Sequence, residues 1–164
     1  MAIKPIMTST SASFTRPSNT TTYAADELVA NSATAGSVSP LSFLISVGYG
    51  RGLIIKAAKL EKSTTTTANS AMTLFLYASS PTVTNGDNAA FLSTESTFVG
   101  TLALATCSAF FSDGASSYNS YNEDNDIHWR LASGSYLYGL LKVTGAYAPG
   151  SAETFEVTLV LEHY

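Results

Sequence analysis

The sequence predicts an all-β protein, a two-sheet antiparallel β-sandwich of jelly-roll type. Apolar residues alternate with polar ones or run continuously, turn-forming clusters separate these segments, and no window of helical length shows helical periodicity. Eight strands are expected near residues 11–16, 23–30, 38–47, 52–61, 71–78, 97–106, 135–147 and 154–163. Two connections, 79–96 and 107–134, are too long for hairpins, and long crossovers fit a jelly roll. An immunoglobulin-like sandwich is the alternative fold.

The N-terminal segment is expected to form an extended arm, residues 1–16, before a single β-sandwich domain, residues 17–164. Pro17 fixes its own φ at about −65° and pushes Arg16 toward extended geometry. The β-branched Thr triplet at 20–22 favours the same region of backbone space. The arm has few large apolar side chains and buries too little surface to order alone, so we expect it to be mobile or held by a neighbouring copy.

Two of the expected strands carry the clearest patterns. In the segment 52–61, Leu53, Ile55 and Ala57 alternate and Leu60 breaks the alternation, which predicts a bulge. In the segment 154–163, apolar residues occupy every second position from 155 to 161. Alternation of this kind predicts a strand with one buried and one wet side.

The two long connections differ in composition. The first contains Ser-Pro and Asn-Gly turn signals, followed by a segment expected to form one helical turn at 89–93. The second, 107–134, contains SDGASSYNSYNEDND and is expected to be the least structured part of the chain. Long connections in compact domains are usually functional or mobile, so both are candidate binding regions.

The composition limits the kinds of partner. Charged residues make up 12% of the chain, against about 25% in an average soluble domain, and Ser and Thr supply the polarity instead. The net charge of −4 is unfavourable for binding nucleic acid, because phosphate contacts need clustered Lys and Arg. No membrane association is expected, since no stretch reaches the ~18 apolar residues of a membrane span. The N-terminal MAIKPIM lacks the apolar core of a secretory signal.

Residue types that carry catalysis are sparse. Cys107 is the single cysteine, so no intramolecular disulfide is expected, and its apolar surroundings predict a buried, inert thiol. The histidines, His128 and His163, form no evident nucleophile set and are too few for a zinc site. Glycoside hydrolysis needs two opposed carboxylates, and the available ones are Asp113, Glu123, Asp124, Asp126 and Glu153. Any acidic loop would offer as many, so we expect no catalytic residue, no cofactor, no metal and no enzymatic activity.

Two polar segments allow more than one interpretation. The acidic run 122–126 has oxygen ligands that suit calcium but lacks the Gly and terminal Glu of an EF-hand loop, so a solvated loop is preferred. Asp87 is expected to hydrogen-bond a turn. Tyr118, Tyr121 and Trp129 mix aromatic faces with polar neighbours, as sugar-binding platforms do. Packing of Trp129 against the core is the preferred alternative.

Several segments carry a resemblance to a known family. They are SFTRPSNTTTYAADELVAN at 13–31, SPLSF at 39–43, GRG at 50–52, LYASSPTVTNGDNAAF at 76–91 and YGLLKVTGAYAPGSAETFEVTL at 138–159. In these segments the chain resembles small virion structural proteins of tailed bacteriophages, of the capsid decoration (cement) type. The resemblance implies a virion protein at the capsid surface, synthesised in the host cytoplasm, whose partners are the phage major capsid protein and copies of itself in a dimer or trimer.

The predicted function is therefore capsid decoration, in which the chain binds the outer surface of the major capsid lattice and stabilises the head. The expected arm contacts are Phe14, Arg16, Pro17 and Tyr23, with Tyr118 and Tyr121 as secondary loop contacts. A tail or baseplate component is a close variant of this function. A host-glycan-binding adhesin is the alternative from a different class.

Overall fold

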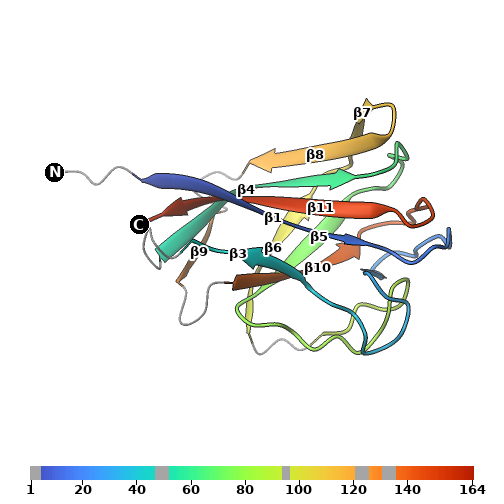
Figure 1. Ribbon diagram of the computed structural model, residues 1–164, viewed down its shortest axis with the longest axis horizontal. Helices are drawn as coiled ribbons and strands as arrows, with labels where there is room; N and C mark the ends of the chain where they lie inside the picture. The colour runs from blue at the N-terminus through green and yellow to red at the C-terminus, as the bar shows by residue number, and fades with distance from the viewer. Residues whose placement is uncertain (1–4, 47–51, 94–96, 121–125, 131–135) are drawn as a thin grey trace.

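The computed structural model describes residues 5–46, 52–93, 97–120, 126–130 and 136–164, which form two antiparallel sheets packed face to face (Figure 1). The regular elements of these residues are all strands. The strands are β1 (Ile6–Thr15), β2 (Leu28–Val29), β3 (Leu41–Leu44), β4 (Gly52–Lys62), β5 (Met72–Tyr77), β6 (Phe98–Leu104), β7 (Ser108–Phe111), β8 (Gly114–Ser120), β9 (Ile127–Arg130), β10 (Tyr136–Val143) and β11 (Thr154–His163).

The strands pair in a nested order, the first with the last and so on toward the middle of the chain. β1 pairs with β11, β2 and β3 pair with β10, β4 pairs with β8 and β9, and β5 pairs with β6. Two further pairs, β11 with β4 and β10 with β5, join the nested hairpins into sheets of order β1-β11-β4-β8-β7 and β2-β10-β5-β6. This is a long hairpin wrapped into a sandwich, so the jelly-roll prediction is confirmed. The immunoglobulin orders ABED and CFG do not fit it.

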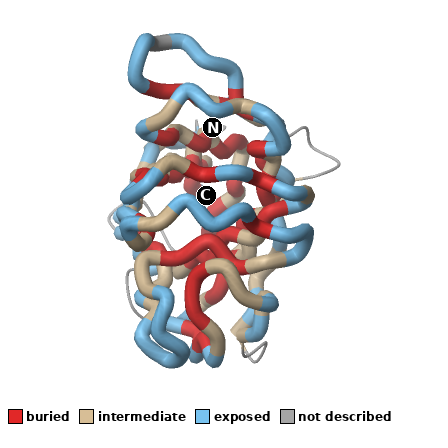
Figure 2. The backbone as a smooth tube through the Cα atoms, turned by 90° about the vertical axis from the view of Figure 1, so that its right-hand side faces the viewer, coloured by how far each residue is buried: buried red, intermediate tan, exposed pale blue. Residues whose placement is uncertain are grey.

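The main core lies between the two sheets and follows the predicted alternation. Phe155, Val157, Leu159 and Leu161 of β11 all face inward and are at most 1% exposed. Figure 2 shows buried stretches of the chain running through the interior, with exposed stretches at the margins. Burial of these side chains is the main favourable contribution to folding, at about 1.5–3 kcal/mol for each large apolar side chain.

The bulge predicted in the segment 52–61 is confirmed. Ala57 of β4 stands opposite Val160 and Ile55 opposite Leu161, which leaves Lys56 as an extra residue in β4. Before the bulge the odd-numbered positions face the core, and after it the even-numbered ones do. The shift turns Lys62 inward, where it forms a buried ion pair with Glu153.

The prediction that 107–134 is the least structured part of the chain is wrong for β7, β8 and β9. β8 pairs with β4 on the side away from β11. Ala115 and Ser117 of β8 are buried, and Tyr118 is exposed. The inward positions of β8 hold small residues, so this strand lacks the large apolar side chains that usually mark one. Residues 121–125 and 131–134 of this connection lie outside the described residues.

The other long connection, 79–96, forms no helical turn at 89–93. Its described part is held by two isolated bridges, Glu27 with Ala90 and Val83 with Ser93. Val83 joins a second, smaller apolar cluster with Leu28, Ala30, Tyr77 and Leu140. The connection is therefore ordered by covering part of the sheet formed by β2, β10, β5 and β6.

The expected N-terminal arm also needs correction. Its residues 6–15 are extended, as predicted, but they form β1, which pairs with β11 of the same chain from Ile6 opposite His163 to Thr15 opposite Thr154. The half-buried Ala12 and Phe14 pack against the main core. β1 orders because β11 offers backbone partners to every second residue along its whole length, a gain that the composition of the segment alone does not reveal.

Truncation of a central core residue tests this arrangement. Leu159→Ala should lower the free energy of unfolding by about 2–5 kcal/mol, because it leaves a cavity between the sheets. Thr158→Ala, on the outer side of the same strand, should cost less than about 1 kcal/mol. Denaturant unfolding followed by Trp129 fluorescence measures both. Equal losses in the two variants would contradict the assigned facing of β11.

Candidate functional site

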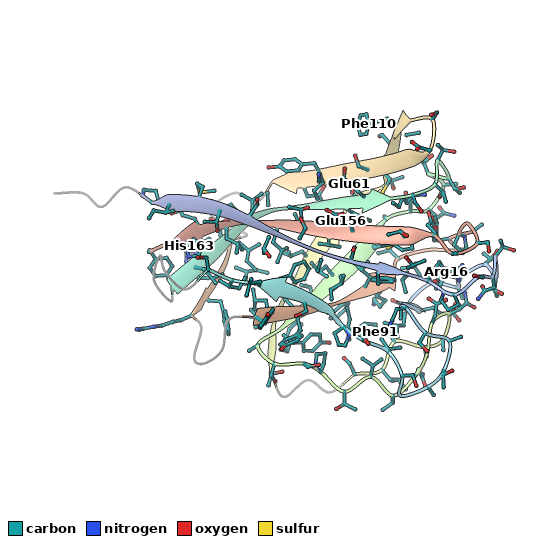
Figure 3. All side chains as sticks on the ribbon, viewed as in Figure 1. Arg16, Glu61, Phe91, Phe110, Glu156 and His163 are labelled. Carbon is teal, nitrogen blue, oxygen red and sulfur yellow. The ribbon has the colours of Figure 1, made fainter. Side chains whose placement is uncertain are left out.

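Arg16 directly follows β1 and is buried at the far end of that strand from His163 (Figure 3). Its Nε donates to the Tyr23 hydroxyl at 2.9 Å, and its Nη2 donates to Asn19 Oδ1 and Asp87 Oδ2, each at 3.0 Å. Its Nη1 donates to the carbonyls of Asn19 at 2.5 Å and Gly150 at 3.2 Å. A guanidinium has five N–H donors, so this set uses all of them inside the protein.

Asp87 is the anionic partner at this end of the sandwich. One carboxylate oxygen accepts from Arg16, and the other accepts from the Tyr23 hydroxyl at 2.5 Å and the Ala30 N–H at 2.9 Å. Burial raises the pKa of Tyr23, and the hydrogen bond to Asp87 raises it further. The phenol therefore stays protonated at neutral pH and acts as a structural donor.

A second buried ion pair lies nearby, between Lys62 Nζ and Glu153 Oε1 at 3.0 Å. The Tyr147 hydroxyl lies 2.7 Å from the Oε2 of this carboxylate and donates to it, and the Gly150 N–H donates to the same oxygen at 3.2 Å. Lys62 also donates to Thr64 Oγ1 at 2.9 Å. Burial and the Glu153 carboxylate raise the pKa of Tyr147, so this phenol is also a donor.

The two ion pairs are joined into one network. Gly150 accepts from Arg16 through its carbonyl and donates to Glu153 through its N–H. The rings of Tyr23 and Tyr147 stack with centroids 6.2 Å apart. A buried charge that loses its partner costs several kcal/mol, so the network fixes the path of the chain around this end of the sandwich. Its groups bond to one another and to backbone groups nearby, which gives the network a structural role.

Two expected partner contacts are corrected by this geometry. Arg16 and Tyr23 are both buried and bonded to Asp87, so they are not surface contacts in this fold. Phe14 is half-buried, and its ring lies 5.7 Å from that of Phe155. Pro17 is half-buried, and its carbonyl accepts from the Asn19 N–H at 2.8 Å.

The expected loop contacts have different outcomes. Tyr118 lies on β8 and is 61% exposed, whereas Tyr121 lies outside the described residues. The sequence reading missed Phe110, which lies on the neighbouring strand β7 and is 68% exposed (Figure 3). The hairpin of β7 and β8 therefore carries two large exposed aromatic side chains.

The outer face of the sheet formed by β1, β11, β4, β8 and β7 is rich in hydroxyl groups. Ser11 and Thr158 are hydrogen-bonded across β1 and β11 at 2.8 Å, and Thr15 and Thr154 at 2.9 Å. Glu61 and Glu156 stand opposite each other on this face (Figure 3), with Lys59 2.8 Å from Glu61. Charge on this face is therefore local and partly neutralised.

A groove of about 550 Å³ opens beside the free edge of β1. One wall is β1 from Ala12 to Thr15, and the other is the segment 39–42 at the start of β3. Phe14 and Leu41 contribute apolar surface, and Ser13 and Ser39 contribute hydroxyl groups. The groove separates the edges of the two sheets on this side of the sandwich.

Three further candidate residues, Asp126, Trp129 and Cys107, have structural roles. Asp126, the described end of the acidic run 122–126, pairs with Lys56. Trp129 packs against the main core, as the preferred interpretation held, and Cys107 is buried, with burial raising the pKa of its thiol. Within the described ranges, no three His, Cys, Asp or Glu side chains are placed to hold a metal ion. Nor does any helix among them have the length and apolar character to cross a membrane.

The sequence reading also missed the buried network. Asp87 was expected to bond a turn, and it does accept the Ala30 N–H, but its main partner is Arg16. The sequence shows Glu153 only as one of several available carboxylates, with no indication that Lys62 is its partner. One signal was present in the sequence, because the bulge in 52–61 places Lys62 on the same side as Leu60.

No known family model and no curated protein matches this chain. Solved structures of virus particles align with nearly all of it at low similarity. The extra small virus VLP of the giant freshwater prawn Macrobrachium rosenbergii is 8% identical with a TM-score of 0.28, over 99% of this chain and 81% of that one. Turnip yellow mosaic virus is 12% identical with a TM-score of 0.31, over 100% and 83% of the two chains. Desmodium yellow mottle tymovirus is 15% identical with a TM-score of 0.30, over 99% and 83%.

At these identities and TM-scores the likeness carries no argument about function. The class of protein defined here, an antiparallel jelly-roll sandwich, rests on the strand order of the chain itself.

The buried network gives a stability prediction. Asp87→Asn removes the charge that compensates Arg16, so the free energy of unfolding should fall by about 3–5 kcal/mol. Glu61→Gln removes one partner of the exposed pair with Lys59 and should change the free energy of unfolding by less than about 1 kcal/mol. Denaturant titration of both variants makes the comparison. A loss in Asp87→Asn no larger than that in Glu61→Gln would show that the buried pair does not hold the fold.

A second prediction concerns acid stability and His163. This residue is 3% exposed at the end of β11, its Nε2 lies 2.7 Å from Thr8 Oγ1, and burial lowers its pKa below the ordinary 6.5. Below about pH 6.5 the unfolded chain takes up a proton at this site more readily than the folded one, so the free energy of unfolding falls as the pH falls.

His163→Gln should therefore lose less stability than the unmodified protein between about pH 7 and pH 5. Unfolding titrations across this range decide the matter. Identical pH profiles for His163→Gln and the unmodified protein would remove His163 as the source of acid sensitivity.

Proposed function

We propose that this chain is a virion structural protein of a tailed bacteriophage that binds the outer surface of the major capsid lattice and stabilises the head. The proposal starts from the resemblance carried by residues 13–31 and 76–91. It is also consistent with a jelly-roll domain whose described buried acids and bases are committed to structural pairs.

The observation that carries the proposal is the exposed aromatic pair on the β7–β8 hairpin, Phe110 and Tyr118. Aromatic side chains are enriched at protein interfaces, where they bury large area at small entropic cost. On the same sheet, β1, β11 and β8 present many Ser and Thr side chains, which lose little conformational freedom when covered. A broad, rigid protein surface is the kind of partner that suits this arrangement.

The stabilising effect follows from mass action. A protein that binds the assembled shell but not its separated subunits stabilises the shell by its binding free energy. Binding repeats at every symmetry-related site, so modest affinity at each site adds up over the particle. The chain needs no chemistry of its own for this role, only a surface that matches the lattice.

The adhesin alternative is less well supported by the described residues. Trp129, one member of the supposed sugar platform, packs against the core. An aromatic pocket of about 230 Å³ does exist, lined by Phe75, Tyr77, Phe91, Leu92, Ser93 and Phe98. Its hydroxyl groups, those of Tyr77 and Ser93, are bonded to each other at 2.7 Å. Sugar recognition needs several polar groups directed at the ligand.

The proposal can be tested by co-sedimentation with empty heads that are assembled from the major capsid protein of the same genome and lack this chain. The unmodified protein should pellet with the heads and raise their melting temperature. The double variant Phe110→Ser, Tyr118→Ala should bind at least tenfold more weakly, since loss of an interface anchor costs more than about 1.4 kcal/mol.

Leu44→Ser is the matched control, because Leu44 is 58% exposed but lies on the other sheet. It should bind as the unmodified protein does. Binding to purified tails and not to heads would contradict capsid decoration and favour a tail or baseplate role. Saturable binding to host polysaccharide without binding to heads would favour the adhesin.

A further inference from the structure

β1 is an edge strand of its sheet, with β3 of the other sheet as its neighbour across the groove, and its own sequence lacks the features that usually protect an edge strand. It is terminal in its sheet and pairs with β11 alone, over ten residues without a register shift. Natural edge strands are usually short, bulged, or guarded by Pro or charged side chains. β1 contains no Pro and no charged residue, and at about 3.4 Å per residue it is about 34 Å long. The opposite edge strand of this sheet, β7, has four residues and lies next to a register shift.

The pairing with β11 fixes which backbone groups of β1 face outward. The Arg16 N–H donates to the Glu153 carbonyl, just beyond the pair of Thr15 with Thr154. Hydrogen-bonded residues alternate along an antiparallel strand, so the even-numbered residues of β1 bond to β11. The N–H and C=O groups of the odd-numbered residues point away from the sheet; these residues are Met7, Ser9, Ser11, Ser13 and Thr15.

We infer that a second copy of this chain binds at this edge, through antiparallel pairing of the two β1 strands around a two-fold axis at Ser11. This register sets Ser11 opposite Ser11 of the second copy, Ser9 opposite Ser13, and Met7 opposite Thr15. It engages the outward groups of all the odd-numbered residues, and each such pair exchanges two N–H···O bonds. Axes at Ser9 or Ser13 leave one end of the strand unpaired.

The same register brings exposed apolar side chains to the groove. Ile6 and Met7 are 42% and 52% exposed at the start of β1. In the pairing around Ser11, they stand opposite Arg16 and Thr15 of the second copy, beside the groove that Phe14 and Leu41 line. Even-numbered side chains of β1 point toward the core side. Ile6 is therefore directed to the groove side of the proposed interface between the two β1 strands. The two-fold axis repeats this contact at the other end.

The lack of charge on β1 permits a second copy as the occupant. The chain carries a net charge of −4, so most approaches between copies meet repulsion, but β1 contributes none of that charge. Its outward side chains are mainly Ser and Thr, and Ser11 already pairs with Thr158 across the adjacent strand at 2.8 Å. Pairing of the two β1 strands would extend this row of Ser and Thr side chains from one copy to the next. The inference does not depend on the capsid function, since it concerns the free protein.

Sedimentation of the purified full-length protein tests the inference. At about 50 μM the unmodified protein should sediment as a dimer of the 17.2 kDa chain. Ser11→Lys sets two like charges across the axis, and Ser11→Pro removes an outward N–H without touching the bonds to β11. Each change should raise the dimer dissociation constant at least tenfold while the circular dichroism spectrum stays that of a β protein. Thr158→Lys adds the same charge to the same face one strand away and should leave the dimer intact.

Cross-linking tests the register itself. Cα atoms of a hydrogen-bonded antiparallel pair lie about 5.5 Å apart, within disulfide reach. Ser11→Cys should therefore oxidise to a covalent dimer, and Thr158→Cys should not. A monomer at this concentration, a trimer, a dimer unaffected by both Ser11 changes, or equal cross-linking of the two cysteine variants would each overturn the inference.

Discussion

The buried ion pair between Arg16 and Asp87 is the interaction on which this end of the molecule depends. It joins the end of β1 to the connection between β5 and β6, and Asp87 reaches β2 through the Ala30 N–H. These segments belong to different sheets, so the pair links the two layers beyond their apolar contact. The charge also selects the arrangement, because any alternative that buried Arg16 without Asp87 would leave an uncompensated cation in the interior.

Burial of charged residues in ion pairs also leaves fewer charges on the surface. The chain has eight Lys and Arg residues in total, and Arg16 and Lys62 are buried in ion pairs. Long-range electrostatic steering toward a partner is correspondingly weak, and close-range fit becomes the main source of specificity. Exposed aromatic side chains at β7 and β8, and outward backbone groups along β1, are the kinds of group that such short-range contacts use.

The sequence was sufficient for the fold class and for the strands with strong alternation. β4 and β11 end within one residue of the expected positions, because large apolar side chains at every second position mark a buried face. β8 is hard to predict because its buried positions hold Ala115 and Ser117, which give little hydrophobic signal. The site was harder to predict. Nothing local shows that Arg16 meets Asp87, 71 positions away, so a buried cation was taken for a surface contact.

The nested strand order also affects how the chain is made. β1 pairs with the last strand, and Thr8 meets His163 across 155 positions of sequence. A ribosome adds about 5–20 residues per second, so β1 emerges roughly 10–30 s before β11 is available. During that interval the first strand has no native partner, and closing such a long loop makes folding slow. Crowded nascent chains would then compete for the same uncharged edge, which makes synthesis rate and chaperone supply, not final stability, the limit on the yield of folded protein.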